Sequence, residues 1–309
     1  MYNPSDYSII TFPSLGLEMN PERGFSIGSF TIHYYGVMIA LGLLLAVAYG
    51  LRRRKQFGIT ENDLLDGVLW VTPFAIVCAR VYYCIFSWSE YAADPISVLY
   101  IWNGGLAIPG GIIGAVIGIL LFCKVKKIKP GTVLDLVLLG FLIGQSLGRW
   151  GNFFNREAFG AETESFLRMG LFNTKTNQFQ YFHPTFLYES LWNIAGFVLL
   201  HFLSRKRKYD GQIALGYVAW YGFGRTFVEG LRVDALPAGS IRITQVLAAV
   251  CCFAAVVILL WQAFRVHDPK KLYVNQLAAS QPEETQGTDE PEEAFTEESG
   301  EDFEEEQEA

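Results

Sequence analysis

Histidine and cysteine are scarce in this chain of 309 residues, which narrows the chemistry that its sequence can support. The four histidines do not occur at the spacings of a metal site, so we expect no bound metal ion. The five cysteines lie in or beside apolar segments, and none belongs to a Cys-x-x-Cys pair. Cysteines in such positions are typical of small buried hydrophobic residues. The sequence therefore predicts neither a metal centre nor a paired-cysteine site.

Basic residues are missing from the C-terminal part of the chain. From Gln276 to Ala309 there are 14 acidic residues and no lysine or arginine. An acidic segment with few aromatic residues cannot bury enough apolar surface to fold. We therefore expect residues 268–309 to form a disordered acidic tail. The rest of the chain carries 24 basic and 17 acidic residues. We expect no nucleic-acid partner for this protein.

Long apolar segments make up most of the remaining chain. Seven of them approach the 20 residues or so that cross the hydrocarbon core of a bilayer as an α-helix. They cover residues 35–51, 64–86, 105–123, 132–149, 185–203, 212–230 and 242–264. The sequence thus predicts an all-α integral membrane protein, with an N-terminal arm at 1–34 and seven transmembrane helices within 35–267.

Clusters of lysine and arginine follow every second predicted span. They read RRRK at 52–55, KVKKIK at 124–129 and RKRK at 205–208, and a fourth group at 265–271 follows the last span. With seven spans, all four clusters lie on one side of the membrane, and the positive-inside rule places that side in the cytoplasm. The N-terminus and the segment 150–183 are then expected outside, as a small extracytoplasmic head, and the acidic tail is expected in the cytoplasm.

Charged residues inside these spans gather, on this topology, in one layer near the outer face. Arg80, Arg149 and Arg225 interrupt apolar segments. An arginine there costs about 2.5–3.5 kcal/mol on insertion scales and normally faces a bundle interior or a cavity. Glu229 follows Arg225 by one helical turn, so we expect these two side chains to pair. Because guanidinium groups match phosphate oxygens two at a time, the layer predicts a site for an anionic lipid headgroup.

Several other features have simpler alternatives. Arg156 and Arg232 could belong to the same layer or could only anchor helix ends at the lipid headgroups. Glycines repeat every four residues over 110–118 and 140–148, and close packing of helices is sufficient to explain them. The motif GQSLG matches the Gly-x-Ser-x-Gly of serine hydrolases, but it lies in a membrane helix instead of a strand–turn–helix unit, so we assign Ser146 to packing.

Two rival protein classes would also place arginines inside a bundle. A transporter of anionic metabolites would usually show internal repeats or broken helices near the midplane, and the sequence has no self-similar half. A seven-helix receptor would not need three arginines within its spans. Turnover by purified components would distinguish an enzyme from both classes.

The segment GRWGNFFNREAFG at 148–160 resembles the signature Gly-Arg-x-Gly-Asn-Phe-x-Asn-x-Glu-x-x-Gly of the bacterial prolipoprotein diacylglyceryl transferases. Further matches follow in the same order along the chain: HYYG at 33–36, WNGGLAIPGG at 102–111, HPTFLYE at 183–189 and YGFGRTFVEGLR at 221–232. The resemblance covers about residues 20 to 265, which is everything except the tail.

The resemblance implies a membrane-bound reaction without a cofactor. In this family the diacylglyceryl group of phosphatidylglycerol moves to the thiol of the lipobox cysteine in a prolipoprotein signal peptide, a thioether forms, and glycerol phosphate leaves. This is the first step of lipoprotein maturation and takes place in the bacterial cell membrane. The implied catalytic residues are Arg149, Arg225 and Tyr35. The residues expected to bind phosphatidylglycerol are Arg149, Asn152, Glu157, Gly160, Arg225, Glu229 and Arg80.

The chain departs from the family at Pro109, where many members have a histidine that is a favoured general base. Proline has no proton to exchange, so either no base is needed or another group serves. A free thiol has a pKa of about 8.5, which falls next to arginines. Fixed guanidinium groups also stabilise the charge that develops on the leaving phosphate. We therefore expect Arg149 and Arg225 to activate the reaction without a histidine base.

Overall fold

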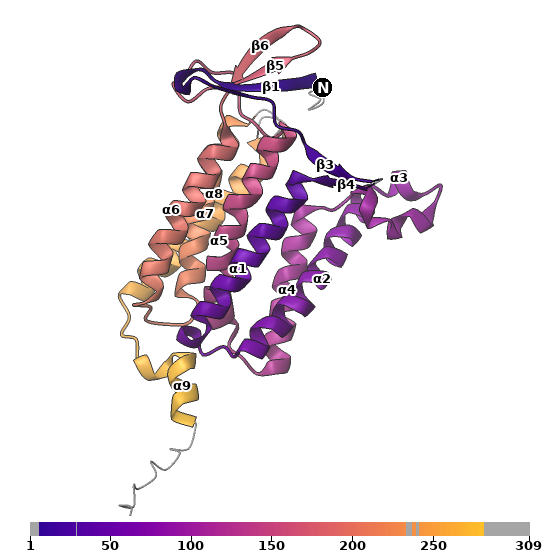
Figure 1. Cartoon of the computed structure of the whole chain (residues 1–309). Helices are drawn as coiled ribbons and strands as arrows, with labels where there is room; N and C mark the ends of the chain where they lie inside the picture. The colour runs from indigo at the N-terminus through magenta and orange to yellow at the C-terminus, as the bar shows by residue number, and fades with distance from the viewer. Residues whose placement is uncertain (1–5, 29, 233–236, 239–240, 281–309) are drawn as a thin grey trace, which may run out of the picture.

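Seven long helices lie side by side in one bundle in the computed structural model, which describes residues 6–28, 30–232, 237–238 and 241–280 (Figure 1). They are α1 (Tyr34–Phe57), α2 (Glu61–Phe86), α4 (Ile108–Lys126), α5 (Pro130–Asn155), α6 (Thr185–Ser204), α7 (Gln212–Leu231) and α8 (Ile243–Ala263). Each helix coincides with one apolar segment of the sequence. The prediction of a mostly helical fold is therefore confirmed.

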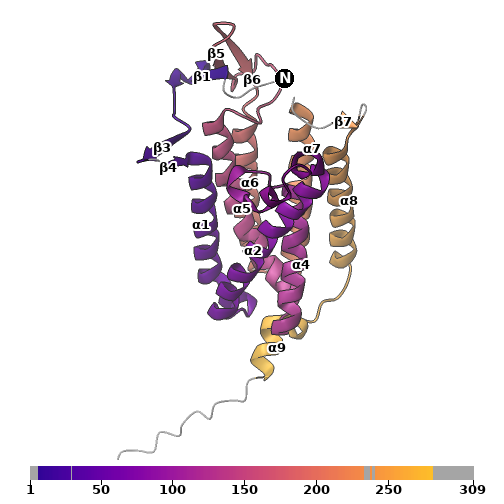
Figure 2. The same ribbon diagram turned by 90° about the vertical axis from the view of Figure 1, so that its right-hand side faces the viewer.

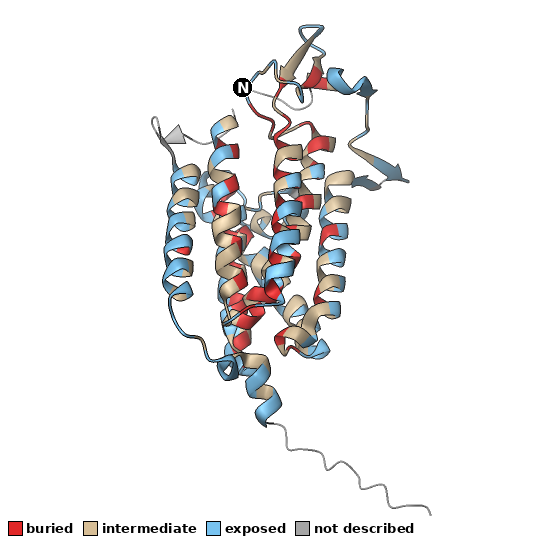
Figure 3. Cartoon of the chain, turned by 90° about the vertical axis from the view of Figure 1, so that its left-hand side faces the viewer, coloured by how far each residue is buried: buried red, intermediate tan, exposed pale blue. Residues whose placement is uncertain are grey.

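Six of these helices are long and apolar enough to cross a membrane, namely all except α7. The sequence of α7 contains Arg225 and Glu229, which lower its apolar character. Many residues on the outer faces of the helices are exposed (Figure 3). Leucine, isoleucine, valine and phenylalanine are prominent among the exposed residues. Several apolar helices with such a surface indicate a multi-pass membrane protein. The count of seven spans and their orientation remain predictions.

Local sequence explains where several helices begin and end. Thr60 precedes α2, and its side-chain oxygen accepts a hydrogen bond from the backbone N–H of Asp63 at 3.1 Å, as an N-cap does. Gly58 ends α1 in the left-handed conformation that favours glycine, with φ of 69°. Pro109 lies in the first turn of α4, where its missing N–H removes no helical hydrogen bond.

The start of α7 is capped by a neighbouring helix. The buried carboxylate of Asp135 on α5 accepts hydrogen bonds from the backbone N–H groups of Gly211 and Ala214, each at 2.9 Å. Nearby, the guanidinium of Arg207 stacks over the ring of Phe57 at the end of α1, 4.1 Å from its centroid. Burial lowers the pKa of Arg207 from its ordinary value. These contacts tie α1, α5 and the α6–α7 turn together.

Small residues allow the helix backbones to approach closely. A Cβ atom added to Gly114 on α4 would lie 2.5 Å from the Cβ of Cys78 on α2. A Cβ atom on Gly42 of α1 would lie 3.0 Å from the Cα of Gly144 on α5. Close packing therefore accounts for these repeats, as expected. Gly148 differs, because a Cβ atom there would meet no other atom within 4 Å.

A pair of tryptophans joins α6 to α7. The rings of Trp192 and Trp220 stack with centroids 4.2 Å apart. The Nε1–H of Trp192 donates to the carbonyl of Trp220 at 3.0 Å, and the Nε1–H of Trp220 donates to the carbonyl of Trp192 at 2.9 Å. Gly196 and Gly224 provide the space that each opposing indole fills.

A four-stranded antiparallel sheet covers one end of the bundle (Figure 1). Its order is β2 (Leu17–Met19), β1 (Tyr7–Phe12), β5 (Met169–Asn173) and β6 (Gln178–Phe182). Ile10 and Leu171 face each other across β1 and β5 and are fully buried. The N-terminal arm and the segment between α5 and α6 thus form one unit. The expected all-α description holds for the bundle, and the sheet is a correction to it, because strands this short carry little sequence pattern.

Shorter elements complete the end of the bundle that carries the sheet. They are the hairpin β3 (Gly24–Ile27) and β4 (Phe30–His33), the helix α3 (Trp88–Tyr91), the 3₁₀ turns at Pro13–Leu15, Pro95–Leu99 and Ile101–Asn103, and the strands β7 (Pro237–Ala238) and β8 (Ile241–Arg242). β4 leads directly into α1, and the two 3₁₀ turns that follow α3 connect α2 to α4.

The chain past α8 returns to the opposite end of the bundle (Figure 2). A 3₁₀ turn (Pro269–Lys271) precedes α9 (Tyr273–Ser280). The backbone N–H of Tyr273 donates to Oδ2 of Asp210 at 2.9 Å, and Val274 packs against Gly58. Residues 269–280, which were included in the expected disordered tail, are thus ordered because they contact the turns between helices. The rest of that tail, 281–309, lies outside the described residues.

Candidate active site

Four charged side chains from α5, α6 and α7 meet at the end of the bundle that carries the sheet. Nη2 of Arg149 on α5 lies 2.6 Å from Oε2 of Glu189 on α6. Nη1 of Arg225 on α7 lies 3.3 Å from Oε1 of the same carboxylate. Nη2 of Arg225 also pairs with Glu229, one turn later on α7. Glu189 therefore bridges the two arginines, and the expected Arg225–Glu229 pair is present.

The arginines are the accessible side of this network. The side chains of Arg149 and Arg225 are 21% and 17% exposed, whereas those of Glu189 and Glu229 are 6% and 4% exposed. Two positive and two negative charges balance, which offsets the cost of removing each from water. Among the described residues, the Nε–H groups of both arginines have no hydrogen-bond partner, so each guanidinium retains a donor for a ligand.

Helix α8 holds the carboxylate of Glu229 in place. The hydroxyl of Thr244 donates to Oε1 of Glu229. Next to it, Nε2 of Gln245 donates to the carbonyl of Thr226 on α7 at 2.8 Å. Both contacts come from the first turn of α8, so this turn determines where Glu229, and through it Arg225, can lie.

A group of amides continues from Arg149 toward the sheet. Nη1 of Arg149 lies 3.5 Å from Oδ1 of Asn152. The side-chain amides of Asn152 and Asn155 both donate to Oε1 of Glu157, each at 3.1 Å. Glu157 can accept from both because the helix ends at Arg156, whose left-handed φ of 55° turns the chain back. The structure thus brings Arg149, Asn152 and Glu157 together, as predicted, in one chain of polar contacts.

Tyr35 lies in the first turn of α1 and faces α5. A Cβ atom on Gly151 would lie 2.3 Å from Cδ2 of Tyr35, so the tyrosine ring fills the space that this glycine leaves. Glu157 and Arg149 are the charged neighbours of the hydroxyl. Within the described part of the chain the hydroxyl has no hydrogen-bond partner. It is therefore available to a ligand beside Arg149.

Gly160 shapes the loop that follows α5. Its backbone N–H donates to the carbonyl of His183 at 2.9 Å, and it forms an isolated β-bridge with Arg232 at the end of α7. A Cβ atom there would lie 2.7 Å from the Cβ of His183 and 2.9 Å from the carbonyl oxygen of Leu231. Only glycine permits this approach, so Gly160 holds the loop against α6 and α7.

Arg80 differs from the other arginines of the predicted layer. It is 5% exposed, and its five N–H groups donate to backbone carbonyls between α2 and α4. The acceptors are Ser97, Val98, Tyr100, Gly104 and Gly105, at 2.6–3.4 Å. No donor remains for a phosphate. The prediction that Arg80 binds the lipid is corrected by this geometry, because the loop takes every donor it has.

Arg156 has a role of the same kind. It is 5% exposed, and its guanidinium donates to the carbonyl of Ser8, the carbonyl of Pro21 and Oδ1 of Asn20 at 2.6–2.8 Å. It thus anchors the N-terminal arm on the end of α5 and does not snorkel to the headgroups. Arg156 was expected either to join the charged layer or to anchor a helix end at the lipid headgroups. Its contacts with the N-terminal arm correspond to neither expectation.

Glu189 is the residue of the network to which the sequence assigns no role. Its position at the start of an apolar segment predicts that it belongs to the outer polar layer, but the sequence does not identify it as a site residue. The available signal was a carboxylate within the first turns of an apolar helix, a position that is costly without a partner. Thr244 carried no such signal, because a threonine at a helix start is common and its contact with Glu229 joins segments 15 residues apart.

Comparison with known proteins adds the family. The family model for prolipoprotein diacylglyceryl transferase matches residues 23–261. The chain belongs to this family. Among its relatives, the phosphatidylglycerol–prolipoprotein diacylglyceryl transferase of Limosilactobacillus reuteri is 45% identical over 251 residues, which cover 78% of this chain and 90% of the relative.

Other members give the same result. The enzyme of the same name from Lactiplantibacillus plantarum is 42% identical over 253 residues, with 79% of this chain and 89% of the relative covered. That of Bacillus velezensis is 40% identical over 263 residues, with 83% of this chain and 97% of the relative covered. Because the matches extend over most of each chain, the resemblance inferred from the motifs is confirmed, and the protein is a transferase.

Proposed function

We propose that this protein transfers the diacylglyceryl group of phosphatidylglycerol to the thiol of a lipobox cysteine in a prolipoprotein signal peptide. The membership of the family and the names of its relatives support this substrate pair. The observation that carries the proposal at the level of residues is the convergence of Arg149 and Arg225 on one carboxylate, Glu189. Two guanidinium groups held this close can bind one phosphodiester between them.

The reaction breaks one bond and forms one. The cysteine sulfur attacks the glyceryl carbon that carries the phosphate, the C–O bond breaks with its electron pair on oxygen, and a C–S thioether forms. The thiol proton is released to water, and glycerol phosphate departs with the added negative charge, so that charge is conserved. Arg149 and Arg225 stabilise that charge where it develops, which is the role of preorganised donors in a site of low dielectric.

The other residues of the site hold these two arginines and the headgroup. Glu189 and Glu229 orient the guanidinium groups through the ion pairs described above. The hydroxyl of Tyr35 and the amide of Asn152 face the headgroup, and Glu157 fixes the amide. Gly160 contributes by shaping the loop. We leave Arg80 out of the lipid site and assign it to the loop between α2 and α4.

The same proposal includes the topology. α7 counts as a seventh span because it packs against α5, α6 and α8 along its length. With seven spans the basic clusters face the cytoplasm, and the site and the sheet lie on the outer face of the bacterial cell membrane. Residues 1–34 and 150–183 then form the extracytoplasmic part, 35–267 the membrane domain, and 268–309 the cytoplasmic tail.

Purified components test the reaction directly. The protein, phosphatidylglycerol and a lipobox peptide should together yield the thioether peptide and glycerol phosphate in equal amounts. A peptide with serine in place of the cysteine is the matched control and should give neither product. A transporter or receptor would bind or move anionic ligands without this chemistry, so absence of product from well-folded protein would contradict the proposal.

A further inference from the structure

One groove among the described residues lies far from the charged network, on an exposed apolar face of α6. It has a volume of about 810 Å³. Its walls are apolar over two turns of helix and consist of Ala195, Val198, Leu199, Phe202 and Leu203. Apart from Ala195, these side chains are 44–58% exposed. An open apolar groove on a membrane helix suits a hydrocarbon chain.

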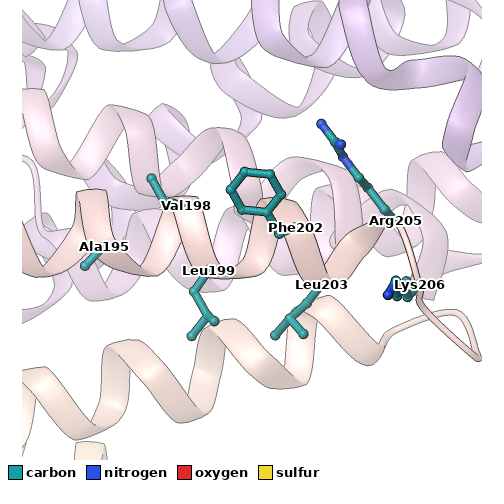
Figure 4. A pocket seen from close by; sticks show the side chains of 7 residues that line it. All are labelled: Ala195, Val198, Leu199, Phe202, Leu203, Arg205 and Lys206. Carbon is teal, nitrogen blue, oxygen red and sulfur yellow. The ribbon is translucent and has the colours of Figure 1, made fainter.

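One end of this α6 groove is basic. Arg205 and Lys206 complete its lining, and no acidic residue takes part in it. Figure 4 shows the two basic side chains at the end of the row of apolar ones. Both residues are exposed. The groove therefore combines an apolar length with a positive end, which is the complement of a phospholipid with a negative headgroup.

The guanidinium of Arg205 is held in place by its neighbours. Its Nη2 lies 3.2 Å from Nε2 of His201, and its Cζ lies 5.2 Å from the centre of the Phe202 ring. Nδ1 of His201 is in turn 2.8 Å from the hydroxyl of Tyr49 on α1. These contacts orient the cation before a ligand arrives, and they connect the end of the groove to a second helix.

The α6 groove is separate from the proposed reaction site. Arg205 follows Glu189 by 16 residues in a nearly continuous helix, which corresponds to about 24 Å along its axis. A phospholipid whose headgroup reaches Arg205 thus belongs to the leaflet opposite to the one that reaches Arg149 and Arg225. That leaflet attracts juxtamembrane basic residues through its anionic lipids when it faces the cytoplasm.

We infer that the α6 groove binds one anionic phospholipid, with an acyl chain along Leu199 and Leu203 and the headgroup phosphate on Arg205 and Lys206. The lipid is a structural ligand, not a substrate. It stabilises the junction of α6 with α1 through the Arg205–His201–Tyr49 contacts. This inference does not depend on the proposed reaction, since it concerns the other end of the bundle.

A photoactivatable phosphatidic acid with a diazirine on one acyl chain tests the inference. The full-length protein is placed in phosphatidylcholine nanodiscs with this probe, irradiated and digested, and labelling of residues 195–206 is measured by mass spectrometry. Unlabelled phosphatidic acid should compete, and extra phosphatidylcholine should not. The double variant Arg205→Gln/Lys206→Gln should lower the labelling about 30-fold, the effect of two basic residues at an anionic surface.

Two further variants separate the groove from general effects. Arg52→Gln removes an exposed basic residue at the same end of the bundle and should leave the labelling unchanged. Leu199→Trp fills the groove with the charges intact and should lower the labelling as the double variant does. Transfer activity of all three should stay near wild type, which also reports that they fold.

Several outcomes would overturn the inference. Equal competition by phosphatidylcholine, or unchanged labelling in Arg205→Gln/Lys206→Gln, would mean that the groove holds only passing bilayer lipid. Labelling that rises when residues 281–309 are removed would mean that the chain's own acidic segment occupies the basic end. A dimer that buries 195–206 in solution would mean that a second copy covers it.

Discussion

The α2–α4 pair and the α5–α6–α7 group each place arginine within an apolar helix, but the partners differ. Arg80 on α2 gives all five N–H groups to neutral carbonyls of one loop. Arg149 and Arg225 share the carboxylate of Glu189, Arg225 also pairs with Glu229, and both keep donors unpaired within the described part of the chain. An arginine saturated by carbonyls holds a loop, whereas an arginine held by a carboxylate with donors to spare can bind a ligand.

The largest loss of activity should come from replacing the guanidinium group of Arg149 or Arg225. Arg225→Lys and Arg149→Lys keep the charge but lose the paired donors, so kcat/KM should fall by about 100-fold or more. The measurement is glycerol phosphate release per mole of folded protein. Activity of Arg225→Lys close to wild type would show that charge alone is sufficient at that position.

Glu189→Gln should have the next largest effect on rate. The amide keeps the shape but loses the charge that bridges the two arginines, and we expect kcat/KM to fall by about 10–100-fold. Glu164→Gln is a suitable control, because Glu164 lies in the segment between α5 and β5 and forms no ion pair with Arg149 or Arg225. If Glu189→Gln matched wild type, the carboxylate bridge would be structural only.

Arg80→Lys should separate stability from rate. A lysine cannot reach five carbonyls, and buried carbonyls left without a donor cost about 1–3 kcal/mol each before relaxation. The thermal midpoint should drop by several degrees or more. Activity per folded molecule should remain within about threefold of wild type, since no donor of Arg80 is free for the lipid. A loss of rate as large as that of Arg225→Lys, without loss of stability, would return Arg80 to the lipid site.

Truncation at the C-terminus tests which part of the tail contributes to stability. Removal of everything after Ser280 should change neither rate nor stability. Removal of everything after Lys271 also deletes α9 and its contacts with Asp210 and Gly58. We expect the thermal midpoint of this shorter variant to fall by about 2–4 °C for each kcal/mol of lost packing, with near-normal rate below that temperature.

The smallest change is expected at Pro109. Pro109→Ala should affect stability slightly and rate hardly at all, because the proline only begins α4. Pro109→His restores the residue of many relatives. If the arginines alone activate the thiol, wild type and Pro109→His should gain rate together as pH rises. A new ionisation near 6.5, the ordinary histidine pKa, together with faster turnover would show that a base had been limiting.

The sequence predicted the seven helices and the Arg225–Glu229 pair, but it did not predict the partners of Glu189 and Arg80. The same physical reasons explain both results. Apolar length and basic clusters are properties of continuous segments, so all seven helices could be located. Arg225 and Glu229 lie one turn apart, so their pairing could be read from spacing. Glu189 could not be paired in advance, because its partners come from two other helices. The acceptors of Arg80 come from a loop whose path has no periodic pattern.

The sheet was missed for a related reason. β1 and β5 are separated by most of the bundle, and each has only five or six residues. Strand pairing at such a distance leaves no local signature in either segment. The glycine repeats were read correctly as packing for Gly114 and Gly144, but Gly148 faces open space beside Arg149. Spacing identifies the face of a helix and does not say what lies opposite.

The tryptophan pair between α6 and α7 fixes the relative height of these two helices along the bundle axis. Its two hydrogen bonds run in opposite directions, so a slide of either helix along the other lengthens both bonds at once. Glu189 stands three residues before Trp192, and Arg225 stands five residues after Trp220. The height at which carboxylate and guanidinium meet is therefore set by two neutral side chains that take no part in the ion pairs. The ion pair therefore does not by itself set the relative height of α6 and α7. We expect this height to stay the same when a lipid phosphate binds to the arginines.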